Sequence, residues 1–291
     1  MLPPINNSRP SELTMKLWNN ITNFDTPLIL SPKWSKQNDI EVAVKLRGEL
    51  MGGIYACRTR QKFHYGGMSL YYCEVAGNPN GTMTALVIGN SFSMNIIAAV
   101  SSNPIFSKTI SIWTNGRNFP MHDGLETYFM EHAIKAKKPD VTFIVQRYFH
   151  KYLYDTPIDK IPEHPEFKHW NKILETIQNY TSAIIMNKEQ VVFPYDISQD
   201  YIRRRFYDLY LESRLKNPQK SETMDAWFSA LNCSKCAFFD YRSFCDGNFC
   251  NIIDLATGLP LFRDTEHISP IGLRFLKPFI DSAINKALKI E

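Results

Sequence analysis

Short apolar segments alternate with amphipathic segments along most of the chain, and this alternation limits the folds open to it. The apolar segments are Thr84–Ile88, Thr109–Trp113, Val141–Val145 and Ala183–Met186. Helical patterns separate and follow them at Phe92–Val100, Gly124–Lys137, Glu166–Tyr180, Gln199–Lys216 and Glu222–Leu231. Such alternation is typical of a mostly parallel sheet with helices on both faces. We therefore predict a three-layer α/β fold whose functional groups lie beyond the carboxyl ends of the strands.

The first 80 residues lack this alternation. They contain a helical stretch near Ile40–Met51, followed by a segment rich in Tyr and Gly between Cys57 and Cys73. We predict that residues 1–80 form an irregular N-terminal region, which packs on the α/β domain formed by residues 81–291.

The composition excludes several classes of protein. Hydrophobic residues make up 44% of the chain and charged residues 21%, which favours a globular domain over a disordered one. The net charge of +4 is small and indicates no nucleic-acid partner. No segment has the roughly 18 consecutive apolar residues of a membrane span, and the N-terminus lacks the pattern of a signal peptide. The chain also has no glycine-rich phosphate-binding motif, so no cofactor is predicted.

A serine follows the first predicted strand in the run Gly89-Asn90-Ser91-Phe92-Ser93. Glycine permits a tight turn from strand to helix, which would expose the Ser91 hydroxyl beside the backbone N–H groups of a helix N-terminus. Such N–H groups can stabilise an oxyanion. Taken alone, Gly-x-Ser more often marks an ordinary helix N-cap.

A histidine and an aspartate precede the last predicted helix, in the run Asp264-Thr265-Glu266-His267-Ile268-Ser269-Pro270. Ser269 and Pro270 form a helix start, so His267 is predicted to lie in the loop before it. An imidazole can remove the proton of a serine hydroxyl, and a carboxylate fixes the tautomer of that imidazole. Taken alone, Asp-x-x-His is better explained as a surface pair.

Together the two motifs resemble the SGNH (GDSL-like) hydrolase family, whose first block reads Gly-Asp-Ser and whose last block reads Asp-x-x-His. Asn90 in place of Asp resembles the SGNH domains attached to membrane acyltransferase-3 proteins, a set abundant in nematodes. The run from Cys250 to Pro270 is similar to that group as well. The resemblance implies a flavodoxin-like SGNH hydrolase fold with Ser91, His267 and Asp264 as the catalytic triad.

The same resemblance suggests residues that hold the oxyanion or the substrate. Gly116, after the second strand, matches the glycine of the second block, although Asn-Gly is also an ordinary turn. The third block usually reads Gly-x-Asn-Asp, whereas this chain has Gln146-Arg147-Tyr148. Arg147 is expected to orient the substrate or the site, and Gln146 is an alternative donor. Asn90, directly before Ser91, is the fourth residue expected to hold the oxyanion or the substrate.

The six cysteines and the sequons indicate an oxidising compartment. The cysteines are Cys57, Cys73, Cys233, Cys236, Cys245 and Cys250, and Asn6, Asn20, Asn80, Asn179 and Asn232 each begin an Asn-x-Ser/Thr triplet. The last four cysteines also permit a zinc site. Because the resemblance implies a lumenal domain, we expect disulfides and no metal, with three pairings open for the last four cysteines and Cys57–Cys73 as the remaining bridge.

These observations predict an enzyme that transfers an O-acyl group, most simply acetyl, to carbohydrate hydroxyls through an acyl-Ser91 intermediate. The alternatives are an O-acetyl esterase and a non-catalytic, disulfide-stabilised lumenal binding domain. The resemblance implies that a membrane acyltransferase-3 domain delivers the acyl group. We therefore expect this lumenal or extracellular chain to be part of a longer protein with a membrane or signal segment.

Overall fold

The four apolar segments predicted as strands are parallel neighbours in one sheet. They are seen in a computed structural model that describes residues 10–48, 57, 59–120, 123–218 and 220–290. The chain divides into two units. The first, here the sheet unit, comprises Gly53–Gln190, Gln219–Ser243 and Leu276–Glu291; the second, here the helical unit, comprises Met1–Gly52, Val191–Pro218 and Phe244–Phe275.

The sheet unit is built on a seven-stranded sheet in the order β1-β2-β4-β3-β5-β6-β8. The five strands from β4 to β8 are parallel, whereas β1 and β2 add an antiparallel hairpin next to β4. This arrangement confirms the predicted mostly parallel α/β fold. The strands are β1 (Thr59–Tyr65), β2 (Met68–Ala76), β3 (Met83–Gly89), β4 (Phe106–Thr114), β5 (Val141–Val145), β6 (Ala183–Asn187) and β8 (Cys236–Phe239).

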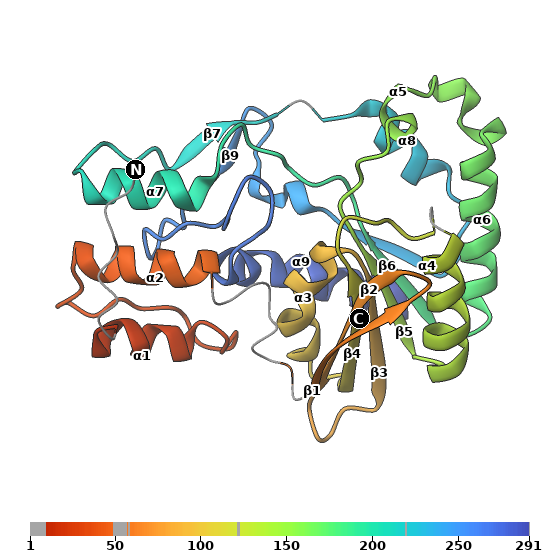
Figure 1. Cartoon of the computed structure of the whole chain (residues 1–291), viewed down its shortest axis with the longest axis horizontal. Helices are drawn as coiled ribbons and strands as arrows, with labels where there is room; N and C mark the ends of the chain where they lie inside the picture. The colour runs from red at the N-terminus through yellow and green to blue at the C-terminus, as the bar shows by residue number, and fades with distance from the viewer. Residues whose placement is uncertain (1–9, 49–56, 58, 121–122, 219, 291) are drawn as a thin grey trace. The chain divides into compact units, whose positions relative to one another are not determined.

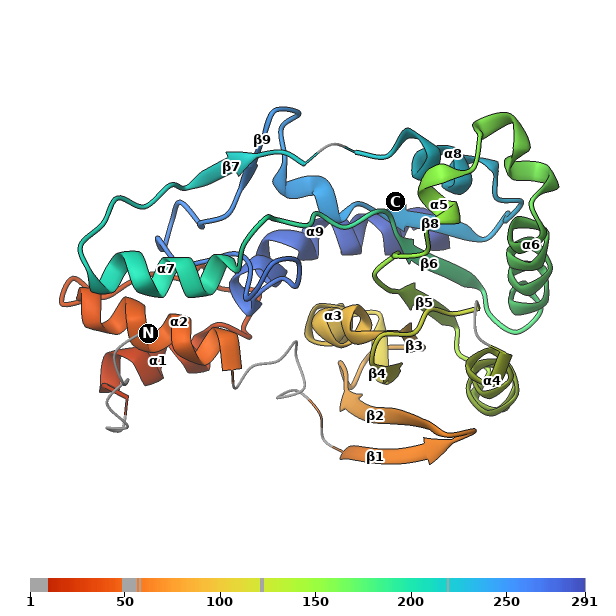
Figure 2. The same cartoon turned by 45° about the horizontal axis from the view of Figure 1, so that its top comes forward.

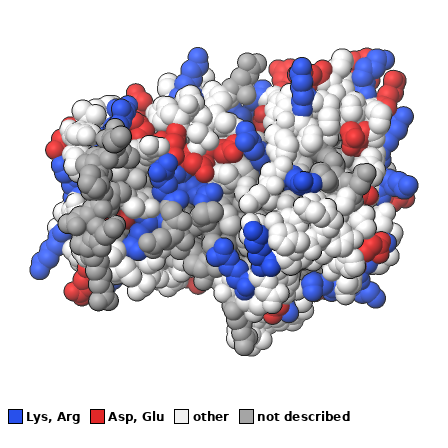
Figure 3. Space-filling view, in the orientation of Figure 1, with Lys and Arg blue, Asp and Glu red and all other residues white. Residues whose placement is uncertain are grey.

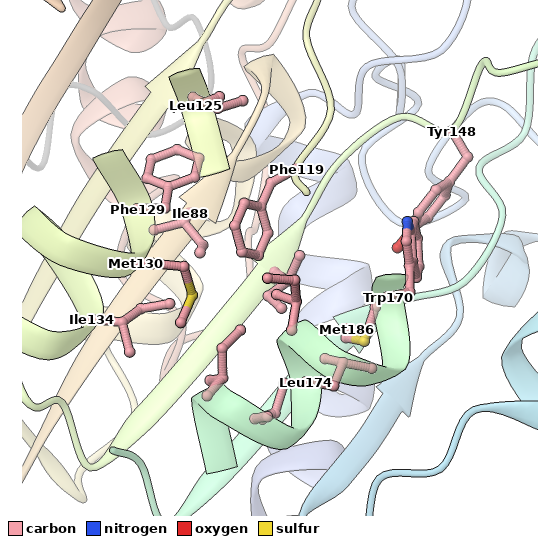
Figure 4. Close-up of a cluster of buried hydrophobic side chains, with 14 of the residues drawn as sticks. Ile88, Phe119, Leu125, Phe129, Met130, Ile134, Tyr148, Trp170, Leu174 and Met186 are labelled. Carbon is pink, nitrogen blue, oxygen red and sulfur yellow. The ribbon is translucent and has the colours of Figure 1, made fainter. Parts of the chain in front are cut away.

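One face of the sheet is covered by a large apolar core (Figure 4). Leu86 and Ile88 of β3 belong to it, together with Phe129 and Trp170 from the covering helices. The neighbouring β3 residues Ala85 and Val87 are equally buried but, because strand side chains alternate, point to the opposite face. Burial on both faces explains why these strands appear in the sequence as continuous apolar runs.

Helices lie on both faces of the sheet unit (Figure 2). On one face, α3 (Ser91–Ser101) contacts β3, β4 and β5, and its Met94 and Ile97 pack with Cys73 and Trp113. The large core contains side chains from the helices of the other face. The remaining helices of this unit are α4 (Asp123–Thr127), the π-helix η2 (Tyr128–Lys135), α5 (Tyr152–Asp155), the 3-10 helix η3 (Ile158–Glu163), α6 (Pro165–Gln178) and α8 (Glu222–Ala230).

The helical unit contains α1 (Glu12–Asn20), α2 (Lys36–Gly48) and α7 (Ile197–Phe206), which lie side by side in Figure 1, and a two-stranded ribbon of β7 (Arg214–Lys216) and β9 (Phe249–Asn251). Ion pairs join α2 to α7 and the turn after it: Arg47 lies 2.8 Å from Asp196, and Lys36 lies 2.7 Å from Asp208. The 3-10 helix η4 (Tyr241–Phe244) and α9 (Pro270–Leu288) each have residues in both units.

Two sequence-based expectations need correction. The helix predicted at Gln199–Lys216 ends at Phe206, because Asp208 adopts a left-handed φ of +54° and the Leu209 N–H donates to the carbonyl of Arg204. This is the usual way in which a helix is closed. Residues 1–80 are also more regular than expected, since they include α1, α2, β1 and β2. The helix expected near Ile40–Met51 is α2, and residues 49–51 lie outside the described residues.

All six cysteines form disulfides: Cys57–Cys73, Cys233–Cys236 and Cys245–Cys250. The expected Cys57–Cys73 bridge is confirmed, and the other four cysteines pair with their nearest neighbours in the sequence. Four bonded sulfurs leave no thiolate for the alternative zinc site. Within the described ranges, no group of His, Cys, Asp and Glu side chains is arranged to hold a metal ion.

Candidate active site

A turn with strict steric requirements leads from β3 into α3. Gly89, the last residue of β3, has a φ of +144°, and a Cβ atom at this position would lie 2.0 Å from the carbonyl oxygen of Val145. Only glycine combines this conformation with so close an approach of two strands. The tight strand-to-helix turn predicted at Gly89 is therefore present, and Ser91 follows it as the first residue of α3.

Asn90, not Ser91, caps α3. The Asn90 side-chain oxygen accepts hydrogen bonds from the backbone N–H of Phe92 at 3.2 Å and of Arg147 at 3.1 Å. Its amide nitrogen donates to the Asn118 side-chain oxygen at 2.8 Å and to the Arg147 carbonyl at 3.2 Å. Because Asn90 caps the helix, Ser91 is not the N-cap. The simpler interpretation, in which the Ser91 hydroxyl serves only as a helix cap, is therefore wrong.

The loop after β4 contains the predicted Gly116 and a residue that the sequence interpretation missed. Gly116 is exposed and has a φ of +66°, which is typical of a turn. Two residues later, Asn118 is 1% exposed and bonded to Asn90, directly before Ser91. The only signal for Asn118 in the sequence is its place in a polar loop at the carboxyl edge of the sheet.

The residues after β5 hold two loops together. Gln146 is fully buried; its side-chain oxygen accepts from the Phe119 N–H at 2.9 Å, and its amide nitrogen donates to the Phe119 carbonyl at 2.7 Å. Gln146 therefore fixes the loop after β4. The Arg147 backbone bonds to Asn90, and the Arg147 side chain is partly exposed. Roles for Gln146 and Arg147 toward a substrate stay predictions.

Asp264 and His267 form a hydrogen-bonded pair within the helical unit. The His267 Nδ1 lies 2.9 Å from Oδ2 of Asp264 and 3.1 Å from Oδ1. The backbone N–H groups of Glu266 and His267 donate to the same Oδ1 at 2.9 Å and 2.8 Å. The Asp264 carboxylate therefore has three donors, which fix its orientation and that of the imidazole.

These bonds also set the charge of Asp264. Burial raises the pKa of its carboxyl group, but the His267 side chain and the two backbone N–H groups outweigh burial and lower the pKa to about 2. Asp264 is thus ionised at neutral pH and faces Nδ1 of His267. A general base in this position needs the tautomer with the proton on Nδ1 and the lone pair on Nε2.

The loop that carries His267 is fixed at both ends. The Arg263 N–H donates to the His267 carbonyl at 2.9 Å. On the other side, the Ser269 hydroxyl oxygen accepts from the Gly272 N–H at 3.1 Å and the hydroxyl donates to the Pro260 carbonyl at 2.7 Å. Ser269 therefore acts as the predicted N-cap of α9, and Pro270 is its first helical residue.

The sequence matches a family model described as the SGNH domain fused to AT3 domains, over residues 56–282. The chain belongs to this family. Among solved structures, the SGNH domain is similar to the periplasmic domain of a lipopolysaccharide acetyltransferase from Salmonella ser. Paratyphi A. The TM-score is 0.50 and the identity 13%, and the match covers 87% of this chain and 98% of the other.

An acetylxylan esterase from Geobacillus stearothermophilus also matches, with a TM-score of 0.35 and an identity of 15%, over 72% of this chain and 96% of the other. No protein of curated function matches the sequence. Membership of the SGNH family supports an enzyme with acyl transferase or esterase activity.

Three disulfides indicate an extracytoplasmic location. None of the described helices is both long and apolar enough to cross a bilayer.

Proposed function

We propose that this SGNH domain transfers an O-acyl group, most simply acetyl, to a carbohydrate hydroxyl through an acyl-Ser91 intermediate. The observation that carries the proposal is the Asp264–His267 pair. The ionised Asp264 carboxylate lies at Nδ1 of His267, which leaves Nε2 as the ring nitrogen that would accept the Ser91 proton. Ser91 follows the first parallel strand at the carboxyl edge of the sheet, where such folds place their sites.

The proposed reaction has two matched steps. The Ser91 Oγ bonds to the acyl carbonyl carbon while its proton passes to Nε2 of His267, and the carbonyl electron pair forms an oxyanion beside the N–H groups of Ser91 and Gly116. When the oxyanion collapses, the bond to the donor's oxygen breaks and that oxygen takes the proton from His267. An acceptor hydroxyl then attacks the acyl-Ser91 ester in the same way, which restores the Ser91 hydroxyl.

The carbohydrate acceptor and the acyl donor are inferred from the comparisons. The family takes its description from a fusion with AT3 domains, and the similar Salmonella domain belongs to a lipopolysaccharide acetyltransferase. We propose that a membrane-embedded AT3 domain supplies the acyl group and that an extracytoplasmic sugar hydroxyl receives it. Water as the acceptor would make the same site an O-acetyl esterase.

Covalent labelling tests the nucleophile. A fluorophosphonate probe is expected to modify Ser91 in the wild-type protein and to leave Ser91→Ala and His267→Ala unmodified. The matched control is His169→Ala, because His169 forms another histidine–carboxylate pair, 2.6 Å from Glu126. This control should label at the wild-type rate. A folded wild-type protein that does not label would instead favour the non-catalytic binding domain.

Product analysis separates transferase from esterase. Purified protein is incubated with p-nitrophenyl acetate, with and without an oligosaccharide acceptor, and the products are examined by mass spectrometry. A transferase is expected to add 42 mass units (about one acetyl group) to the oligosaccharide, with Ser91→Ala inactive. Release of free acetate alone, at a rate unaffected by the oligosaccharide, would show that the esterase interpretation is the correct one.

A further inference from the structure

Asn118 lies at the point where the loop after β4 meets the start of α3. Its side-chain oxygen accepts a 2.8 Å hydrogen bond from the amide nitrogen of Asn90, the residue directly before Ser91. Asn118 is 1% exposed, and Gln146 holds the adjoining Phe119 backbone in place. The amide of Asn118 is therefore fixed close to the residue we propose as the nucleophile.

The orientation of this amide follows from the bonding around Asn90. Two backbone N–H groups, of Phe92 and Arg147, donate to the Asn90 side-chain oxygen, so the Asn90 amide nitrogen is the group that faces Asn118. Asn118 must present its oxygen to that nitrogen. Its own NH₂ group consequently points away from Asn90.

That NH₂ group has no acceptor. The Asn118 Nδ2 is buried and makes no hydrogen bond within the part of the chain that the structure describes. A buried donor left unpaired costs about 1–3 kcal/mol, and nearly all buried polar atoms in folded proteins avoid this cost. The Asn118 side chain is bonded to Asn90, the residue directly before Ser91, so this unpaired donor would gain a partner if an acceptor formed at Ser91 during the reaction.

We propose that the Asn118 side-chain amide donates a hydrogen bond to the oxyanion formed when Ser91 attacks the acyl group. This inference rests on the proposed function. No bond of Asn118 breaks: the Ser91 proton goes to His267, and the Asn118 N–H only pairs with the new negative oxygen. Asn118 thereby supplies a side-chain donor in a chain that has Gln146-Arg147-Tyr148, and no asparagine, after its third parallel strand.

The energetic consequence is specific to the transition state. A hydrogen bond made only when negative charge develops raises kcat without strengthening substrate binding. Removal of one such donor typically lowers kcat by about 10²- to 10³-fold. A structural asparagine would instead change stability and affect kcat and KM together.

Two variants separate these roles. Asn118→Asp keeps an oxygen for Asn90 but removes the donor, and Asn118→Ala removes both. Both are expected to lower kcat for p-nitrophenyl acetate and the rate of fluorophosphonate labelling by about 100-fold or more, with KM changed less than about threefold. Circular dichroism and thermal unfolding would confirm that the variants are folded.

The matched control is Asn103, a buried asparagine just beyond the other end of α3. Its amide nitrogen donates to Asp281 at 2.9 Å, and its side-chain oxygen accepts from the Ile105 N–H at 3.1 Å. Asn103→Ala is expected to lower the thermal midpoint and to keep kcat within about twofold of wild type. Similar kcat losses in folded Asn103 and Asn118 variants would overturn the assignment.

A measurement on the wild-type protein needs no variant. In ¹⁵N-labelled protein, the Asn118 side-chain amide resonance should shift downfield when the phosphonyl adduct on Ser91 places an oxygen at the oxyanion position, and the Asn103 resonance should not. If the wild-type protein labels but neither this resonance nor the Asn118 variants respond, the assignment of Asn118 fails alone. If the wild-type protein does not label at all, the proposed function fails with it.

Discussion

At the scale of single residues, the candidate site depends on how Asp264 is held. Three donors surround its carboxylate, and two of them are backbone N–H groups of the three residues that follow it. The short Asp-x-x-His spacing lets one carboxylate close its own turn and orient the imidazole. The pair therefore has its geometry before any substrate binds, as a general base needs.

The depressed pKa of Asp264 predicts a loss of stability in acid. The carboxyl pKa is about 2 in the folded chain, against about 3.9 for an unfolded aspartate. A lowered folded-state pKa stabilises the fold above pH 4, and this contribution is lost as the pH falls toward 2. The difference in unfolding free energy between wild type and Asp264→Asn should therefore shrink by about 2 kcal/mol between pH 6 and pH 2.

Urea unfolding at each pH measures this difference. The control Asp159→Asn alters an exposed carboxylate of η3 and should change the unfolding free energy by no more than about 0.5 kcal/mol. A difference for Asp264→Asn that stays constant across the range would show that the carboxylate is not held as described.

Some of the candidate site could be predicted from the sequence because its motifs are local. Asp264 and His267 lie three residues apart, and Ser91 lies directly after an apolar strand. Asn118 gives no such signal, since its importance comes from a bond to Asn90, 28 residues away in the sequence. The bonds of Gln146 to the Phe119 backbone could not be predicted for the same reason, because the two residues are 27 positions apart in the sequence.

At the scale of elements, apolar strands could be predicted and polar ones could not. Strands β3, β5 and β6 are largely buried and appear as apolar runs, and β4 is buried over its last four residues. By contrast, β1 reads Thr-Arg-Gln-Lys-Phe-His-Tyr and is mostly exposed, because it is an edge strand with one neighbour. Its pairing with β2 depends on partners along the sheet, so local pattern alone did not indicate it.

The disulfides should differ in what they contribute to stability. Cys57–Cys73 joins residues 16 apart and ends in a fully buried Cys73, whereas Cys233–Cys236 joins residues three apart. A longer closed loop restricts the unfolded chain more, by about 3 kcal/mol for the first bridge and about 2 kcal/mol for the second. The double variant Cys57→Ala/Cys73→Ala should therefore be the less stable of the two pairs in urea unfolding.

The matched variant is Cys233→Ala/Cys236→Ala, measured under the same conditions. Equal losses for the two double variants, or a larger loss for the shorter bridge, would contradict an entropic origin for the difference. Loss of secondary structure in Cys57→Ala/Cys73→Ala alone would show in addition that the β1–β2 hairpin needs this disulfide to form.

At the scale of the whole molecule, the surface and the cysteines indicate where the domain works. Basic and acidic side chains are both present on the face shown in Figure 3, in keeping with the small net charge of +4. A net charge this small gives no indication of a nucleic-acid partner. Three disulfides place folding in an oxidising compartment.

An extracytoplasmic location predicts modification of the sequons. Asn20, Asn80, Asn179 and Asn232 are all exposed, and each lies at a helix end or in a turn or loop. Asn6 lies outside the described residues. Protein secreted from a eukaryotic cell should therefore migrate faster after treatment with peptide N-glycosidase.

Single variants locate the glycans. Asn80→Gln and Thr82→Ala disrupt the same triplet at different residues. Each should therefore prevent the same glycan and increase the gel mobility of the secreted protein by the same amount. Asn187→Gln is the control, because Asn187 is buried and begins no such triplet. If enzyme treatment leaves the wild-type mobility unchanged after secretion, exposure of these asparagines is not sufficient for modification. The oxidising compartment inferred from the cysteines would then be one without asparagine-linked glycosylation, since the disulfides alone require only an oxidant.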